Sequence, residues 1–106
     1  MKLLPALKQK KRYVVFEILS DAKYSEKEIK EIISSPTKEF LGDYGLAKAG
    51  IMFIKHKNNK FIIKVNHKYV DQLIAAMILI KKIKNKAVIV KSLTTSGTIK
   101  KANNYV

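Results

Sequence analysis

Apolar and polar residues alternate over Arg12–Leu19, a segment rich in β-branched and aromatic side chains. A period of two places successive side chains on opposite faces of a strand, so Val14, Phe16 and Ile18 should share one face. The pattern therefore predicts a first β-strand, with these three residues as candidates for the core.

The next segment has the spacing of a helix. Ser25 and Glu28 form a capping box, in which each side chain accepts a hydrogen bond from a free amide of the first helical turn. Isoleucines at positions 29, 32 and 33 supply an apolar stripe, and Pro36 is expected to end the helix. We expect a second short helical turn over Thr37–Asp43.

Glycines interrupt the pattern in the loop Gly42–Gly45, and a second strand is predicted over Ala47–Lys57. The pair Asn58-Asn59 separates it from a third strand at Lys60–Val65. Asparagine tolerates the positive φ angles that a two-residue hairpin turn requires. The second and third strands should therefore be antiparallel neighbours.

Asn66 can cap a further helix that is expected to run to about Ile83, and Ala87–Leu93 returns to a strand pattern. The residues of this helix at core spacing are Val70, Leu73, Ile74, Met77 and Ile80. The order β-α-β-β-α-β predicts an α/β (α+β) fold of the ferredoxin-like or RRM-like type, with a four-stranded antiparallel sheet and helices on one face. We divide the chain into a basic N-terminal arm (1–11), a ferredoxin-like domain (12–95) and a basic C-terminal tail (96–106).

Charge is distributed unevenly along the 106 residues, whose formal net charge is +14. Residues 1–12 carry five basic side chains and no acid, and residues 13–43 have a net charge of −3. Residues 44–106 hold thirteen lysines against Asp71 alone. Because like charges at this density repel one another, a folded domain that carries them is expected to meet a polyanion, and nucleic acid is the first candidate.

Composition also excludes some classes of protein. The chain has no cysteine, which excludes disulfides and thiolate chemistry. Its longest apolar stretch, 73–80, is far shorter than the roughly 20 residues that cross a bilayer, and the N-terminus lacks the apolar region of a signal peptide. We therefore expect no membrane association and a cytoplasmic location.

Side chains for general acid–base catalysis are few. His56 lies among lysines near the predicted hairpin and is expected to be a solvated surface residue. His67 is either an exposed or capping residue or a donor to phosphate or base, and its neighbours leave both possibilities open. Seven of the eight acids fall within residues 17–43, and those of the first helix alternate with lysines as on a solvated face. No catalytic residue and no metal site is predicted.

Two activities known for this fold fit the sequence poorly. Acylphosphatases place an arginine and an asparagine over a phosphate-binding loop, but the one arginine, Arg12, has no glycine-rich loop beside it. RNA-recognition motifs stack bases on strand aromatics, whose spacing is missing from Lys60–Val65. What remains is a surface of clustered cations, which binds phosphates with little sequence preference.

The second predicted helix is apolar around its whole circumference over residues 73–80. This places Ile78 and Leu79 outward, as candidates for a protein interface. Cover by the other helix or by the tail is the alternative.

Four blocks of sequence carry a resemblance to a known family. They are Leu4-Pro5 with Lys10–Tyr13 and Phe16-Glu17, then Gly45–Gly50, Val65–Asp71 and Ser96–Ala102. In this order they resemble archaeal ribonuclease P protein component 2, whose eukaryotic relative is the Pop-type subunit of the same ribonucleoprotein. The resemblance implies a protein subunit that supports a catalytic RNA in removing the 5′ leader from precursor tRNA.

Further expectations follow from this resemblance. The RNA subunit would hold the catalytic Mg²⁺, and the protein itself would bind no cofactor. The implied partners are the ribonuclease P RNA, the barrel-shaped protein component 3, other ribonuclease P proteins, a second copy of the chain and, indirectly, precursor tRNA. Gly45, Gly50 and Gly97 look like positions where the loop backbone requires glycine, because a side chain would obstruct the conformation.

The candidate RNA-binding residues come from two sources. Matching positions imply RNA contacts for Lys11, Arg12, His67, Lys68, Ser96, Thr98, Lys100 and Lys101, and Lys10 and Lys64 are added on charge alone. A general RNA-binding or ribosomal-type basic protein and an acylphosphatase-like enzyme remain the alternative interpretations.

Overall fold

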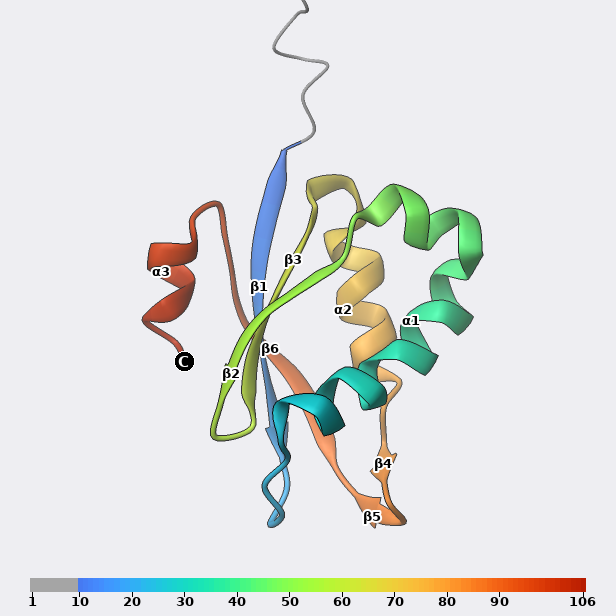
Figure 1. Cartoon of the computed structure of the whole chain (residues 1–106), viewed down its shortest axis with the longest axis vertical. Helices are drawn as coiled ribbons and strands as arrows, with labels where there is room; N and C mark the ends of the chain where they lie inside the picture. Colours follow the sequence, from blue (N-terminus) through green and yellow to red (C-terminus); the bar gives the residue numbers. More distant parts are fainter. Residues whose placement is uncertain (1–9) are drawn as a thin grey trace, which may run out of the picture.

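The computed structural model describes residues 10–106 (Figure 1). Its elements are β1 (Lys11–Leu19), α1 (Glu26–Ala49), β2 (Met52–Lys57), β3 (Lys60–Asn66), the 3₁₀ helix η2 (His67–Tyr69), α2 (Val70–Ile78), β4 (Lys82–Ile83), β5 (Lys86–Ala87), β6 (Ile89–Ser96) and α3 (Ile99–Asn103). Residues 1–9 of the predicted N-terminal arm lie outside the described residues, and Lys11 is already the first residue of β1.

Four strands form one antiparallel sheet in the order β2-β3-β1-β6, which confirms the predicted ferredoxin-like α+β fold. The central strand β1 pairs with β3 on one side and β6 on the other. Val14, Phe16 and Ile18 are buried in the core, as their alternation predicts. Phe16 lies opposite Phe61 of β3, and their rings stack at 5.4 Å between centroids. Helices α1 and α2 cover this face of the sheet.

The predicted end of the first helix is wrong. Ser25 and Glu28 form the capping box as expected, but α1 continues through Pro36. Thr37 is buried beyond the proline, and its hydroxyl donates to the Ile33 carbonyl at 2.6 Å. We attribute the continuation to packing of this buried face, which offsets the hydrogen bond that proline cannot donate.

The backbone of α1 instead breaks at Gly42, where φ is 71° and ψ is 173°. Helical structure resumes after this residue and ends at Ala49, so most of the predicted loop Gly42–Gly45 is helical. The second strand consequently begins at Met52 rather than Ala47. The tight turn at Asn58-Asn59 is confirmed, with φ angles of 51° and 65°.

The second long helix is also shorter than predicted, because α2 ends at Ile78. The small hairpin β4–β5 follows, with positive φ at Lys84 and Asn85. Its apolar residue Ile83 is 4% exposed, so the hairpin closes one edge of the core. The last strand runs to Ser96 instead of Leu93.

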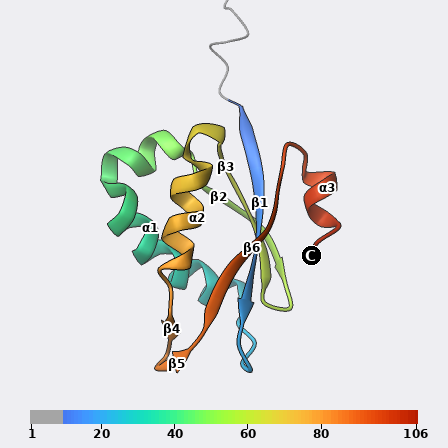
Figure 2. The ribbon, with the colours of Figure 1, turned by 180° about the vertical axis from the view of Figure 1, so that it is seen from behind.

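Helix α3 lies on the face of the sheet opposite α1 and α2, as Figure 2 shows from behind. Its Ala102 is fully buried against Val15 and Ile62, which form a second small apolar cluster. The two helices predicted on one face of the sheet, α1 and α2, do share it, and α3 belongs to the predicted C-terminal tail. The proposed division after residue 95 falls within β6, one residue before its end, and stays a prediction.

Glu28 joins the start of α1 to the β4–β5 hairpin. Its carboxylate accepts hydrogen bonds from the Lys84 ammonium and from the Ser25 amide. These interactions, Lys84 first, lower the pKa of Glu28 from 4.5 to about 2. The ion pair thus ties together two elements that are far apart in the sequence.

A Glu28→Gln variant keeps an oxygen for the capping box but loses the charge that pairs with Lys84. Because the folded-state pKa is lowered, Glu28 stabilises the fold above about pH 4.5, and this contribution disappears as the pH falls to about 2. We expect thermal unfolding midpoints to fall more in the wild-type chain than in the variant across this range. Equal falls in the two proteins would show that the pair adds no stability.

Candidate nucleic-acid interface

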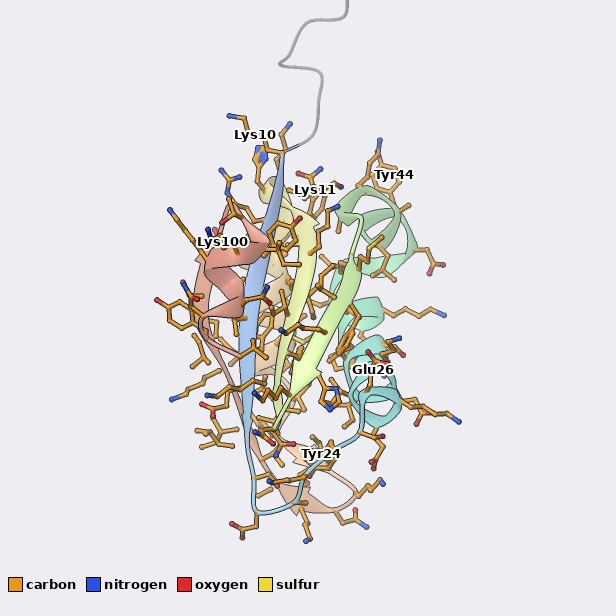
Figure 3. The ribbon with its side chains drawn as sticks, turned by 60° about the vertical axis from the view of Figure 1, so that its left-hand side comes forward. Lys10, Lys11, Tyr24, Glu26, Tyr44 and Lys100 are labelled. Carbon is orange, nitrogen blue, oxygen red and sulfur yellow. The ribbon has the colours of Figure 1, made fainter. Side chains whose placement is uncertain are left out.

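The sheet topology brings three basic segments to one end of the molecule. Since β1 is antiparallel to both neighbours, its first residues lie beside the last residues of β3 and β6. Tyr13 is paired with Lys64 on one side and with Ser96 on the other. In Figure 3, Lys10, Lys11 and Lys100 lie toward this end of the sheet, away from Tyr24. Segments that are far apart in the sequence therefore form one candidate surface.

Backbone and side-chain contacts hold Lys10, Lys11 and Arg12 at this surface. The Lys10 carbonyl accepts a hydrogen bond from the His67 amide at 2.9 Å. Arg12 donates from Nη1 to the Lys11 carbonyl at 3.2 Å, and the same atom lies 3.9 Å from where a Cβ on Gly97 would stand. Arg12 thus lies beside the turn that precedes α3, and Lys10 is exposed.

The hydroxyls of Ser96 and Thr98 are used within the turn itself. Ser96 Oγ accepts from the Thr98 amide at 3.1 Å and donates to the Thr98 carbonyl at 3.0 Å. Thr98 Oγ1 accepts from the Lys101 amide at 3.3 Å and caps α3. Both residues therefore fix the start of α3, whose Lys100 and Lys101 are exposed to solvent.

His67 and Lys68 follow the end of β3. Asn66 caps η2 by accepting a hydrogen bond from the Lys68 amide at 3.1 Å, so the cap predicted at Asn66 is present, but on the 3₁₀ turn rather than on α2. His67 is half-buried, and its Nδ1 is a buried atom without a hydrogen-bond partner among the described residues. Lys68 is exposed. Contact of these two side chains with RNA stays a prediction.

Lys11 has a structural setting that the sequence did not reveal. Gly50 ends α1 with a left-handed backbone, at φ 59° and ψ 45°. The Lys11 ammonium lies 2.8 Å from the position that a Cβ on Gly50 would occupy. A cation there faces the carbonyl end of the helix, where the helix dipole favours positive charge. The helical layer is thereby connected to the basic end of the sheet.

The proposed protein-interface residues lie elsewhere. Ile78 and Leu79, at the end of α2, are 54% and 58% exposed, so the predicted outward orientation is observed. Leu79 also lines a groove of about 480 Å³ beside Pro36 of α1. Their contact with another protein stays a prediction.

Two kinds of feature, a membrane-spanning helix and a cluster of metal ligands, are absent from residues 10–106. No helix there is both long and apolar enough to span a membrane. Nor do the His, Asp and Glu side chains of that range gather into a group of three that could hold a metal ion.

The chain is similar to known proteins over most of its length. Residues 12–106 match the model of the Rpp14/Pop5 family. The chain is 37% identical to ribonuclease P protein component 2 of Pyrococcus abyssi over 101 residues, which cover 93% of this chain and 86% of the relative. The corresponding protein of Methanocaldococcus jannaschii is 36% identical over 100 residues, with coverages of 94% and 75%.

The fold also recurs in a solved structure. A chain in a cryo-EM structure of yeast ribonuclease MRP superposes with a TM-score of 0.71, covering 87% of this chain and 77% of that one. The two sequences are 15% identical, so this likeness bears on the fold alone.

Gly50 and Gly97 provide a test of the backbone at this end of the sheet. In Gly50→Ala, the left-handed conformation costs roughly 1–2 kcal/mol, and the new methyl group must displace the Lys11 ammonium. The expectation that the backbone requires glycine is wrong at Gly97, which lacks a positive φ and whose Cβ would make an ordinary contact, so Gly97→Ala is the matched control. Denaturant unfolding should show a loss of about that size at Gly50 and less than about 0.5 kcal/mol at Gly97. Equal losses would refute this distinction.

Proposed function

Because the chain belongs to the Rpp14/Pop5 family, we propose that it is a protein subunit of ribonuclease P, acting in the removal of the 5′ leader from precursor tRNA. The family match over residues 12–106 carries this proposal, since it spans nearly the whole candidate interface. The interface has the chemistry that such a role requires, because clustered lysines neutralise phosphates and release counterions.

The chain is proposed to support catalysis rather than to perform it. In this mechanism the RNA subunit holds Mg²⁺ and cleaves the phosphodiester, while Lys100, Lys101 and their neighbours stabilise the folded RNA. Lowering the repulsion between RNA phosphates should reduce the magnesium concentration needed for cleavage. The sequence has only two histidines and eight carboxylate side chains for general acid–base catalysis, which supports this division of labour.

The proposed partners are those of a ribonucleoprotein. They are the ribonuclease P RNA, the barrel-shaped protein component 3, other ribonuclease P proteins, a second copy of this chain and, indirectly, precursor tRNA. The groove lined by Leu79 and Pro36 lies on the helical layer, and together with the exposed Ile78 it is the surface proposed for the protein contacts. The assembly is proposed to act in the cytoplasm.

Reconstitution tests the function directly. The purified chain, component 3 and the RNA subunit are assayed for precursor cleavage as magnesium is lowered, with and without this chain. We expect cleavage at modest magnesium to require the chain, and unchanged cleavage without it would overturn the proposal. Hydrolysis of an acyl phosphate by the isolated chain would instead favour the acylphosphatase-like alternative.

Replacing Lys100 and Lys101 with glutamine tests the predicted interface. Loss of two phosphate contacts should weaken RNA binding and reduce the slope of log K against log salt by roughly 1.5. Lys27→Gln with Lys38→Gln makes the same charge change at exposed positions of α1 and serves as the control. An unaltered slope in the Lys100 and Lys101 variant would remove α3 from the interface.

A further inference from the structure

Helices cover the two faces of the sheet unequally. On the face opposite α1 and α2, α3 packs against β6 and β1. Figure 3 shows this face, with the ribbon of α3 to one side of those of β3 and β2. Apart from Ile62 and Ile54, which pack in the small cluster around Ala102 of α3, the β2–β3 half of this face is therefore open to a ligand.

Strand register places four lysines on this open half. Ile62 of β3 packs against Ala102 of α3, which identifies its side of the sheet. Side chains two positions apart share a face, and so do directly paired residues of neighbouring strands. Lys60 and Lys64 of β3 lie on the side of Ile62, and the pairings Lys57 with Lys60 and Lys55 with Ile62 add two lysines of β2. We call these four residues, Lys55, Lys57, Lys60 and Lys64, the lysine strip.

The lysine strip carries little compensating negative charge. Among residues 10–106, none of the four forms an ion pair with a carboxylate. Glu17 of β1 is paired in register with Lys60, but its carboxylate lies 3.9 Å from the ammonium of Lys91. The other acids of this range lie on α1, on α2 or in the loop before α1: Asp21, Glu26, Glu28, Glu31, Glu39, Asp43 and Asp71. The strip therefore presents several uncompensated cations to solvent.

The strip is continuous with the candidate interface. Lys60 and Lys64 are about 13 Å apart along β3, at about 3.3 Å per residue. Lys64 is also the residue opposite Tyr13, at the basic end of the sheet. A chain of phosphates that reaches Lys64 can thus continue along the strip without leaving the protein surface.

We propose that the lysine strip binds the phosphate backbone of the same RNA, extending the interface across the open half of the sheet. Protein interfaces are depleted of lysine and enriched in aromatic residues and arginine, so four lysines with no exposed aromatic among them fit phosphates better than a protein partner. Lys55 and Lys57 are exposed and can reach a ligand without rearrangement. The inference rests on the proposed function, because it assigns a second part of the surface to that RNA.

The triple variant Lys55→Gln, Lys57→Gln and Lys60→Gln tests the strip and leaves Lys64 in place. Binding of the full chain to the ribonuclease P RNA is measured between about 50 and 200 mM salt. Loss of three contacts should reduce the salt slope by about 2 and weaken binding roughly 10- to 100-fold near 100 mM salt. The control triple Lys27→Gln, Lys38→Gln and Lys81→Gln removes the same charge from exposed positions on α1 and after α2.

Equal binding by the strip and control variants would overturn the inference. So would a strip variant that binds RNA normally but fails to bind component 3, since the strip would then serve a protein. Whether the wild-type chain stimulates precursor cleavage tests the proposed function separately. If the variant does not fold, acetylation of the wild-type chain decides: RNA should protect Lys55, Lys57 and Lys60 more than Lys27, and equal modification would refute the proposal.

Discussion

The pairing of β1 with two antiparallel neighbours is the constraint on which the remaining structure depends. Val14 and Phe16 anchor β1 in the core, so its register against β3 and β6 is fixed by burial. A slip by one residue would expose that apolar set and would also separate Tyr13 from Lys64 and Ser96. The interactions that hold the fold together therefore also assemble the basic end of the sheet.

The two layers of the molecule treat their charges differently. On the helical layer, Glu28 pairs with Lys84 and Glu26 lies within 4.0 Å of Lys30, so two of the cations there have a nearby carboxylate. Over β3, β2 and α3 the described residues include no acid at all. At physiological salt, the repulsion between exposed like charges more than about 8 Å apart is largely screened, so the fold tolerates them. The repulsion that remains still opposes the compact state. An RNA bound to the sheet side would relieve that repulsion.

The sequence predicted the fold wherever local and tertiary preferences agree. Asn58-Asn59 gave the right turn because both residues accept positive φ, and the alternation around Phe16 gave the right core face. It failed where packing overrides a local signal: α1 passes through Pro36, and the apolar run that ends at Ile80 hid the turn into β4–β5. Among the site residues, the resemblance selected side chains that the sheet topology brings to one end of the sheet. It could not show that the Ser96 hydroxyl hydrogen-bonds with the Thr98 backbone. Of the lysine strip, the sequence selected Lys64 alone, on charge, because the strand register was needed to place the other three lysines beside it.

These features bear on how the surface can recognise its ligand. The hydroxyls of Ser96 and Thr98 are engaged in hydrogen bonds at the start of α3 rather than free to bond to a base, and the aromatic pair Phe16–Phe61 is buried in the core. What faces the solvent is a set of lysines, each a point charge on a flexible stem. Such groups bind phosphates along the path of the RNA backbone and do not distinguish base sequence. In the proposed complex, selectivity for one RNA must then arise from the shape of that path, which the sheet sets by holding the basic end and the lysine strip at a fixed separation.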